Sequence, residues 1–447
     1  MSYQQFKQDY QGKKVLIMGL GLQGGGVGDA NFFTQIGCQV TATDLKSAEE
    51  LTPSLKRLDS SVKLVLGRHE NQDFQTPDLI IKNPAVVPES PYLKIARQAK
   101  VPISLSTSLF AAYCPAKMIG ITGTRGKSTT AQLIFNICRR AGKKVKLGGN
   151  VRGVATLPLL KGLTLSHWMV LELSSWELAG FHQQKISPQV AIFTNIYPDH
   201  LNRYHSMNDY IFDKTAIFKY QAKENYLIIN QDNAETQQLA EQAKSRVIYF
   251  SQVDWLPEWP LKLLGQHNRA NAAAALRAAL ILGLDQDLIK YTIGQFSGLA
   301  YRLESRATVA GVEFINDTTS TTPIAGEKAL QAINKPVVLL AGGASKKLPL
   351  AAFAKMIRQK AKAVVLLDGS ATDELARLIK KFGGRQKIAG RFANFSQAME
   401  TAYELASPGE AVLLSPGCAS FGMFKNEFDR GDQFNHIVEQ LAHEEKV

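Results

Sequence analysis

The segment from Gly120 to Thr130 (GITGTRGKSTT) contains the residue types of a loop that binds phosphate groups. Glycines let the backbone wrap closely around an anion, and the N–H groups at the start of a following helix point toward it. Lys127 is placed to reach the β- and γ-phosphates of a nucleotide, and the Ser128 hydroxyl is placed to bind Mg²⁺. Position 121 is isoleucine, so the spacing is a TGTxGKST form rather than the standard GxxxxGK[ST] motif. The segment predicts ATP or GTP binding.

Acidic and histidine residues follow two later strands of the same predicted sheet. Glu172 ends the strand in LELSSWEL, and Asp199 and His200 follow the next strand in TNIYPDHLNRYHS. Open α/β sheets bind ligands beyond the carboxyl ends of their strands, so these side chains could converge on a magnesium ion at the phosphate loop. Glu172 supplies the oxygen ligand that Mg²⁺ prefers. A lone histidine in this place is more often a surface or hydrogen-bonded residue, and residue type alone favours a solvated side chain for Lys214 in the predicted helix NDYIFDKTAIF.

A second glycine-rich turn, GLGLQG, follows the first predicted strand and contains Gly19, Gly21 and Gly24. Asp44 closes the next strand about 20 residues later, which matches a dinucleotide-binding fingerprint in form. A lone GxGxxG is weak evidence, so NAD, FAD, another nucleotide and a structural turn all stay open. The phosphate loop further along argues against a simple dehydrogenase and favours ATP acting on a nucleotide-linked substrate.

Strands alternate with helical stretches along the chain, which predicts α/β domains built on parallel sheets with helices on their faces. A chain of 447 residues suggests about three domains. We expect a Rossmann-like N-terminal domain over residues 1–110, a central P-loop ATPase-like domain over 111–297 and a Rossmann-like C-terminal domain over 298–447. The expected elements include strands at Lys13–Gly19, Cys38–Asp44, Met118–Thr122, Trp168–Leu173, Val190–Asn195 and Val312–Asn316, and helices at Ser128–Arg140 and Asn268–Leu282.

Composition excludes several classes of protein. Apolar residues make up 45% and charged residues 20% of the chain, as in a globular protein. The four cysteines are scattered without a CxxC pair, which argues against a zinc site or a disulfide framework. The net charge of +13 suits nucleic acid or an anionic small substrate, but no nucleic-acid-binding motif is present. No signal peptide or membrane-length apolar run is found, so a cytoplasmic protein is expected.

The ordered set of motifs resembles the Mur ligase family over the whole length of the chain. The matching segments are TGTRGKST, LELSSWEL, NIYPDHLNRY, Lys214, GQHNRANAAAA, YRLE, NDTTST and SPGCASFGMFKN. The resemblance is strongest to the branch that joins D-glutamate to UDP-N-acetylmuramoyl-L-alanine for peptidoglycan precursor synthesis. It implies three domains, of which the first binds the UDP moiety, the second ATP, and the third completes the ATP and amino-acid sites. It also implies a monomer.

The resemblance implies a reaction in which ATP phosphorylates a substrate carboxylate and an amine then attacks the acyl phosphate. Domain closure would assemble the site and exclude water. In this scheme Ser128, Glu172 and His200 are metal ligands, and Lys214 matches a lysine that is carbamylated in the family. The expected ATP-binding residues are Gly123, Thr124, Gly126, Lys127, Ser128, Thr129, Asn268, Asn271, Arg302 and Asp317.

The resemblance also implies residues for the other two substrates. Gly19, Gly21, Gly24 and Asp44 would bind the UDP moiety, and Asn150 would lie beside the acyl substrate. The expected glutamate-binding residues are Thr321, Lys346 and Ser420. Residue type alone does not decide the roles of two of these residues, because Lys346 could be a solvated loop lysine and Ser420 could be a helix N-cap.

Four segments depart from the family pattern. The acceptor segment reads Thr318, Thr319, Ser320 and so lacks its usual lysine, and Glu427 stands where an aromatic is expected, with Phe428 next to it. Gln23 replaces a common hydroxyl residue, and the loop often written SPG reads Asn83, Pro84, Ala85. The alternatives are therefore the same family with L-glutamate or another acid as acceptor, an NAD-dependent oxidoreductase, and a nucleic-acid-dependent ATPase.

Overall fold

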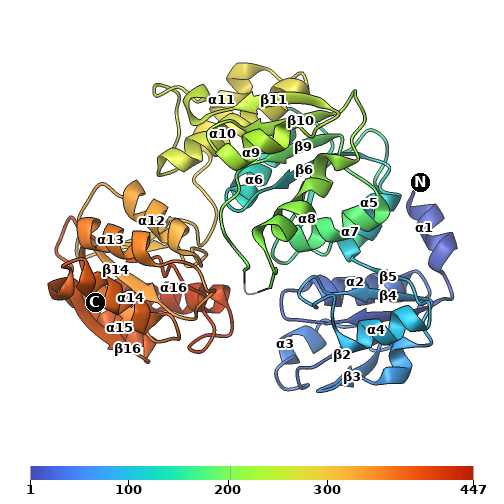
Figure 1. The fold of residues 1–447 in the computed structure, drawn as a ribbon, viewed down its shortest axis with the longest axis horizontal. Coiled ribbons are helices and arrows are strands. Elements are labelled where there is room, and N and C mark those ends of the chain that lie inside the picture. Colours follow the sequence, from blue (N-terminus) through green and yellow to red (C-terminus); the bar gives the residue numbers. More distant parts are fainter. Residues whose placement is uncertain (1, 202, 446–447) are drawn as a thin grey trace. The chain divides into compact units, whose positions relative to one another are not determined.

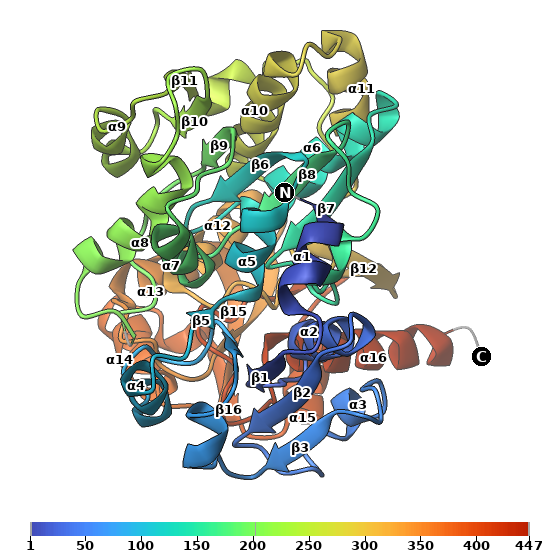
Figure 2. The ribbon, with the colours of Figure 1, turned by 90° about the vertical axis from the view of Figure 1, so that its right-hand side faces the viewer.

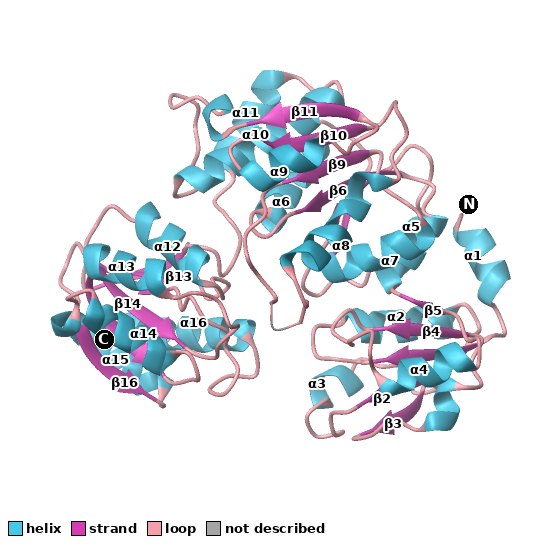
Figure 3. Cartoon of the chain, in the orientation of Figure 1, coloured by secondary structure: helices cyan, strands magenta, loops and turns pink. Residues whose placement is uncertain are grey.

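The computed structural model describes residues 2–201 and 203–445, and the chain forms two compact units. Helices flank three separate sheets (Figures 1 and 3), which confirms the predicted α/β class. The expected domain boundaries near residues 110 and 298 stay predictions. Unit 1 comprises Met1–Ile196, Asn208–Asp254 and Asn271–Thr292, and unit 2 comprises Tyr197–Met207, Trp255–Ala270 and Ile293–Val447.

The first sheet of unit 1 has five parallel strands in the order β3-β2-β1-β4-β5, with β1, β2 and β3 side by side in Figure 2. The central strand β1 is buried along most of its length because its VLIM run faces helices on both sides. The strands are β1 (Lys14–Met18), β2 (Gln39–Asp44), β3 (Lys63–Leu66), β4 (Leu79–Lys82) and β5 (Ile103–Ser104), and the helices are α1 (Tyr3–Tyr10), α2 (Gly25–Gln35), α3 (Thr52–Leu55), α4 (Pro91–Gln98) and α5 (Ser106–Tyr113).

The second sheet of unit 1 has six parallel strands in the order β11-β10-β9-β6-β8-β7. All of its carboxyl ends lie at one edge, so the loops after β6, β8 and β9 are neighbours there. The strands are β6 (Lys117–Thr122), β7 (Val145–Gly149), β8 (Trp168–Glu172), β9 (Val190–Phe193), β10 (Tyr226–Asn230) and β11 (Arg246–Phe250). The helices that follow α5 are α6 (Lys127–Arg140), α7 (Ser175–Gln184), α8 (Met207–Lys219), α9 (Ala234–Ala240), α10 (Gln266–Ile281) and α11 (Gln286–Gln295).

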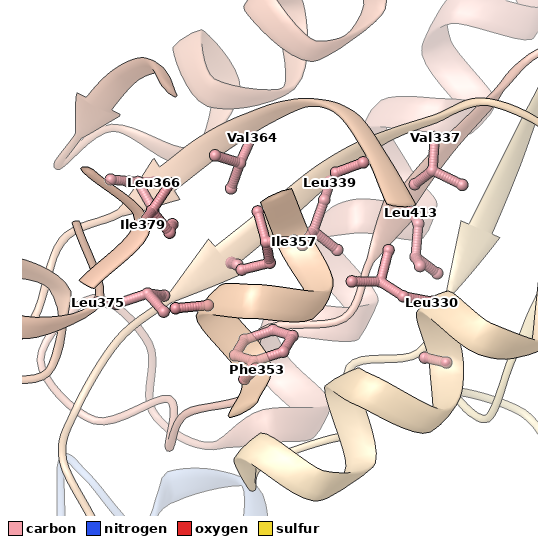
Figure 4. Close-up of a cluster of buried hydrophobic side chains, with 14 of the residues drawn as sticks. Leu330, Val337, Leu339, Phe353, Ile357, Val364, Leu366, Leu375, Ile379 and Leu413 are labelled. Carbon is pink, nitrogen blue, oxygen red and sulfur yellow. The ribbon is translucent and has the colours of Figure 1, made fainter. Parts of the chain in front are cut away.

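The sheet of unit 2 has the order β12-β13-β17-β14-β15-β16, and only its edge strand β12 runs antiparallel. Figure 4 shows one face of its core, where Ile357 lies beside Leu339 and Leu330 lies beside Leu413. The strands are β12 (Glu304–Val309), β13 (Val312–Asn316), β14 (Val337–Gly342), β15 (Ala361–Leu367), β16 (Ile388–Phe392) and β17 (Ala411–Leu414), and the helices are α12 (Pro323–Ala332), α13 (Ala351–Lys360), α14 (Thr372–Lys381), α15 (Phe395–Glu404) and α16 (Glu427–Glu444). Within the described part of the chain, no helix is both long and apolar enough to cross a membrane.

Two buried carboxyl groups are bound by consecutive hydroxyls at the start of α5. Ser106 donates to Asp29 Oδ1 at 2.8 Å, and Thr107 donates to Glu177 Oε1 at 2.9 Å. Asp29 belongs to α2 beside the first sheet, and Glu177 belongs to α7 beside the second. Burial raises the pKa of each carboxyl group to about 7. The first turn of α5 therefore joins the two sheets of unit 1 through two carboxyl groups whose pKa is raised by burial.

We expect Asp29→Asn to stabilise unit 1 at pH 8 and to stabilise it much less at pH 5. The raised pKa means that the native state binds more protons than the unfolded chain between about pH 4 and 7, so stability falls as pH rises through that range. The variant should keep the Ser106 hydrogen bond and melt roughly 2–6 °C above the wild type at pH 8. Thermal melts at both pH values measure this, with the exposed Asp287→Asn as control. Parallel pH profiles for Asp29→Asn and the wild type would contradict the assignment.

Candidate active site

The predicted phosphate loop runs from the carboxyl end of β6 to the start of α6. Gly126 caps the helix in the left-handed region, with φ of +85°. The Lys127 ammonium donates to the carbonyl oxygens of Gly123 at 3.1 Å and Thr124 at 3.2 Å. This places Lys127, Ser128 and Thr129 in the first turn of α6, where backbone N–H groups favour an anion. The strand–turn–helix arrangement that the sequence predicts is therefore present.

Residues after β9 hold the far side of this loop. Asn195 O accepts a hydrogen bond from the Thr124 N–H, and Asn195 Oδ1 accepts one from the Arg125 N–H, both at 2.9 Å. The Thr194 hydroxyl donates to the Arg125 carbonyl at 2.6 Å. A Cβ on Gly123 would lie only 1.9 Å from Thr194 Oγ1, which is why glycine is required there. The sequence motifs did not single out Thr194 and Asn195 as supports of the loop, although both lie in the TNIYPDH segment.

Glu172 lies at the carboxyl end of β8, which pairs directly with β6. Its carbonyl oxygen accepts a hydrogen bond from the Asn150 N–H at 2.8 Å, so Asn150 lies beside it as expected for neighbouring parallel strands. Gly149 makes this approach possible, because a Cβ at that position would be 2.0 Å from Glu172 O. Glu172 is buried and Asn150 is exposed. The structure thus brings the expected metal ligand and the expected acyl-substrate residue together.

We expect Gly149→Ala to damage both stability and catalysis. The new Cβ would meet the Glu172 backbone, and the φ of +85° is unfavourable for any L side chain. A matched control is Gly153→Ala, which has a φ of +77° but no atom within 4 Å of the added Cβ. The control should cost about 1–2 kcal/mol, and Gly149→Ala more than that. Thermal melts and ATP turnover of the two variants measure the difference, and equal effects would contradict a role for this close approach.

Residue type predicted a solvated side chain for Lys214, and that prediction is wrong. Its side chain on α8 is only 1% exposed. The ammonium donates to Gly123 O at 3.0 Å and contacts Thr122 Oγ1 at 3.4 Å, and it lies 4.8 Å from the centre of the Tyr210 ring. The Tyr210 hydroxyl in turn lies 3.1 Å from Thr124 Oγ1. The helix therefore places Lys214 against the phosphate loop.

The two asparagines of the GQHNRANAAAA segment differ in their surroundings. Asn271 belongs to unit 1, where its Oδ1 is 3.5 Å from the Thr130 hydroxyl and lies against Gly126 of the phosphate loop. Asn268 belongs to unit 2 and donates to Leu264 O at 2.8 Å. The structure thus brings Asn271 to the expected ATP loop within one unit.

The residues of unit 1 fit a magnesium nucleotide. No group of three or more His, Cys, Asp or Glu side chains gathers as a metal site among the residues that the structure describes. Mg²⁺ usually keeps several waters and takes only one or two protein oxygens besides phosphate oxygens. The Glu172 carboxylate and the Ser128 hydroxyl follow adjacent strands at one sheet edge and are hard oxygen donors of this kind. His200 belongs to unit 2, and its assignment as a ligand stays a prediction.

The N-terminal glycine turn is built around Asp44. This carboxylate accepts hydrogen bonds from the N–H groups of Gly21 and Lys46, each at 3.0 Å. Gly19 and Gly24 both have φ of +90°, and Gly24 starts α2. Asp44 therefore shapes the turn as well as lying at the expected binding edge.

One departure from the family pattern has a structural explanation at this turn. Asn83 replaces the usual serine, and its side-chain amide donates to Gly19 O at 3.3 Å, while its Oδ1 accepts from the Ala85 N–H at 2.9 Å. The longer side chain links the loops after β1 and β4. Nothing in the structure explains Gln23.

Unit 2 contains the expected acceptor residues Thr321 and Lys346. The Lys346 ammonium donates to Thr321 Oγ1 at 3.1 Å and lies 3.5 Å from Asp199 Oδ1. The Lys346 side chain is 17% exposed, so it is not a solvated loop lysine. His200 is tied to the same carboxylate, with its N–H 2.8 Å from Asp199 Oδ1 and its ring Nε2 3.7 Å from Oδ2. A small pocket here is lined in part by Thr321, Pro323, Ser345, Lys346, Gly417 and Cys418.

Ser420 does not cap a helix, so that interpretation was wrong. Helix α16 is capped instead by Asn426, whose side chain accepts from the N–H groups of Phe428 and Asp429. Ser420 is buried in the preceding loop, and its carbonyl oxygen accepts from the Phe424 N–H at 3.3 Å. Its expected contact with glutamate stays a prediction.

The segment that lacks the family lysine is held by side chains of its own unit. Asp317 accepts a hydrogen bond from the Leu303 N–H, next to Arg302, and another from the Ser415 hydroxyl at 2.8 Å. Burial raises the pKa of Asp317 to about 6. The fully buried Arg430 donates to the Thr318 hydroxyl at 2.9 Å and to its carbonyl oxygen at 2.8 Å. No sequence motif had pointed to Arg430.

Comparison with known proteins agrees with this geometry. Three family descriptions match the chain: "Mur ligase MurD-like, N-terminal domain" over residues 13–104, "Mur ligase middle domain" over 121–255 and "Mur ligase, glutamate ligase domain" over 301–418. A protein of Roseiflexus sp. (strain RS-1) named UDP-N-acetylmuramoylalanine--D-glutamate ligase is 38% identical, over 96% of this chain and 99% of that protein. A protein of the same name from Borreliella afzelii (strain PKo) is 35% identical, over 96% and 98%.

Solved structures support the fold. UDP-N-acetylmuramate-alanine ligase MurC from Thermotoga maritima has a TM-score of 0.65 at 18% identity, covering 96% of this chain and 99% of that one. MurF ligase from Thermotoga maritima in complex with ADP has a TM-score of 0.61 at 15% identity, covering 98% and 97%. At these identities the likeness concerns the fold alone. The full-length relatives and the three matching domains show that this chain belongs to the Mur ligase family.

Proposed function

We propose that this protein joins D-glutamate to UDP-N-acetylmuramoyl-L-alanine at the expense of ATP, in the synthesis of a peptidoglycan precursor. The main observation behind this proposal is the phosphate loop of unit 1. The Lys127 ammonium donates to carbonyl oxygens of this loop, Glu172 lies at the end of the adjacent strand, and the buried Lys214 donates to the same loop. The relatives named for D-glutamate ligation support the choice of acceptor. An NAD-dependent oxidoreductase or a nucleic-acid-dependent ATPase would leave the matched glutamate ligase domain without a role.

The chemistry follows from the poor reactivity of a carboxylate toward an amine. Transfer of the γ-phosphoryl group of ATP to the substrate carboxylate gives an acyl phosphate and ADP. The glutamate amine attacks the acyl carbon, an amide bond forms, and phosphate leaves. Such a transfer depends chiefly on positioning and on neutralising phosphate charge. Lys127 and the N–H groups at the start of α6 supply that charge stabilisation, and we propose that Asn150 orients the acyl substrate.

Mg²⁺ would be held by Glu172 and Ser128 in unit 1, and the family pattern adds His200 as a ligand. When bound, the ion neutralises phosphate charge and orients the phosphoryl group. The remaining nucleotide contacts that we propose come from Asn268, Asn271, Arg302 and Asp317. Thr321, Lys346 and Ser420 bind the acceptor, and the turn around Asp44 binds the UDP moiety.

We further propose that Lys214 is carbamylated. Burying a bare ammonium is unfavourable, and carbamylation converts it to an anionic group with two oxygen acceptors. The position against the loop at Gly123 lets such a group support the metal. We also propose that the protein acts as a monomer in the cytoplasm, where ATP and nucleotide-linked precursors are present.

Phosphate release tests the proposal directly. The protein is incubated with ATP, Mg²⁺ and UDP-N-acetylmuramoyl-L-alanine, and D-glutamate, L-glutamate or no amino acid is added. Release that depends on D-glutamate is the expected result. Release with L-glutamate alone would keep the reaction class and overturn the acceptor. No release with either acid would overturn the proposed substrates.

A further inference from the structure

Positive charge is concentrated in one stretch of the chain. Residues 90–171 contain 13 Lys and Arg residues and no Asp or Glu. The net charge of the whole chain is +13, so acidic and basic residues are equal in number in the rest of it. Two of these cations lie in the phosphate loop, but others gather at the opposite edge of the second sheet of unit 1. We call the following residues the basic edge: Lys117, Arg139, Arg140, Lys143, Lys144, Lys146 and Lys161.

The starts of three strands show that lysines of the basic edge are neighbours. β6, β8 and β7 are adjacent and parallel, so their amino ends lie together at one edge of the sheet (Figure 2). The register pairs Lys117 with Trp168, whose N–H donates to Lys144 O at 2.8 Å. The Lys146 ammonium donates to Lys161 O at 3.0 Å. Every member of the basic edge except Lys146 is exposed, so this edge presents a positively charged surface.

An exposed leucine stands on a hydrogen-bonded turn beside these cations. The N–H of His167 donates to Thr164 O at 3.1 Å, and the Thr164 hydroxyl lies 2.8 Å from His167 Nδ1. Leu165, at the tip of this turn, is 81% exposed. Burial and the positive charges of Lys146 and Lys144 lower the pKa of His167, so the turn lies within the field of the basic edge. Cations around a projecting apolar side chain match a surface that offers anions and hydrocarbon together.

We propose that the basic edge docks on a lipid membrane surface rich in anionic headgroups, with Leu165 entering the headgroup region. Lysine and arginine side chains are attracted to such a surface within a Debye length, and the leucine adds affinity by leaving water. Strand β6 has six residues, which places the basic edge about 20 Å from the phosphate loop at the other end of that strand. The docking surface is therefore separate from the phosphate loop.

A nucleic acid is the other polyanion that a basic surface could bind. Single strands are bound largely by stacking of bases on aromatic rings. Aromatic rings at the basic edge already contact cations of this chain, since the Lys117 ammonium lies 5.5 Å from the centre of the Trp168 ring and the Arg140 guanidinium 4.5 Å from that of Tyr291. A duplex backbone offers phosphates but no hydrocarbon for Leu165. These contacts favour the lipid surface.

Co-sedimentation of the full-length protein with vesicles tests the proposal. Vesicles of equal parts phosphatidylglycerol and phosphatidylcholine should bind the protein at about 0.05 M NaCl, and binding should weaken at least about tenfold at about 0.5 M NaCl. Vesicles of phosphatidylcholine alone should bind at least about tenfold more weakly than the anionic vesicles. Equal binding to the two kinds of vesicle, or no binding to the anionic ones, would overturn the proposal.

Two combined variants with the same loss of charge locate the binding surface. Binding to anionic vesicles should weaken at least about tenfold when three exposed members of the basic edge are replaced, by Lys143→Gln, Lys144→Gln and Lys161→Gln. Binding should stay within about twofold of the wild type when three exposed cations of unit 2 are replaced, by Lys380→Gln, Lys381→Gln and Arg385→Gln. Equal losses in the two variants would show that net charge alone is responsible and would overturn the assignment of the surface.

The leucine is tested by Leu165→Ser, which should weaken binding to anionic vesicles about fivefold or more. The matched control is Val253→Ser, which removes an apolar side chain that is 68% exposed elsewhere in unit 1 and should leave binding unchanged. Wild-type binding by Leu165→Ser would overturn the insertion of this side chain. Binding of a random-sequence DNA duplex or RNA that depends on the basic edge, without binding of anionic vesicles, would assign the surface to nucleic acid and overturn the proposal.

Discussion

Lys214→Ala is expected to reduce ligase turnover at least about a hundredfold, and added formate or acetate is expected to restore part of it. The reason is the position of Lys214, which is buried and whose ammonium donates to Gly123 O of the phosphate loop at 3.0 Å. If its functional form is a carbamate, the alanine variant loses a carboxylate-like group and gains a cavity. A short carboxylic acid can enter that cavity and replace the lost oxygens. Steady-state phosphate release with increasing acid measures the rescue.

The matched control for this prediction is Lys219→Ala on the same helix. Lys219 is exposed, and its ammonium lies over the Phe212 ring rather than at the loop. We expect this control to retain wild-type turnover and to show no response to the acids. Full activity of Lys214→Ala without any added acid would contradict the carbamate. Loss of mass on acidification of the wild type offers a direct check of the modification.

Lys127→Met is expected to lower turnover by about 10³-fold, the range found when a charge that stabilises a transferring phosphoryl group is removed. The Lys127 ammonium spans the carbonyl oxygens of Gly123 and Thr124, so it is already fixed at the mouth of the loop. The loss should therefore fall mainly on kcat, because methionine keeps the length of the side chain but not the charge. Phosphate release at saturating ATP measures it.

Lys143→Met serves as the control for this second prediction. Lys143 is exposed just beyond the end of α6, so its charge is far along the helix from the phosphate loop. The control should turn over ATP at the wild-type rate. Turnover by Lys127→Met within about tenfold of the wild type would contradict the assigned role of the phosphate loop.

The sequence predicted those parts of the site that depend on local backbone geometry. The TGTRGKST segment specifies a strand, a turn and a helix in consecutive residues, so Lys127 and Ser128 could be placed without knowing the rest of the fold. The predicted strand Val312–Asn316 matches β13 to the residue. The antiparallel edge strand β12 escaped notice, because its ESRATV run is half exposed and carries no continuous apolar stretch.

Side chains that meet through the tertiary fold could not be predicted in the same way. Residue type predicted that Lys214 would be solvated, yet the packing of α8 against the phosphate loop buries its side chain. Ser420 looked like a helix cap, but the chain continues through a loop to the true cap at Asn426. The sequence grouped Asp199 with side chains that could converge on a magnesium ion at the phosphate loop, but it could not predict the ion pair with Lys346, which depends on two segments far apart in sequence.

The central claim is that the protein joins one glutamate to its nucleotide-linked substrate for each ATP that it consumes. Mass spectrometry of the product formed from ATP, Mg²⁺, UDP-N-acetylmuramoyl-L-alanine and D-glutamate tests this most directly. The account predicts a nucleotide product heavier than the substrate by one glutamyl residue, with one ADP and one phosphate formed per product. ATP hydrolysis with no change in the mass of the nucleotide substrate would contradict it.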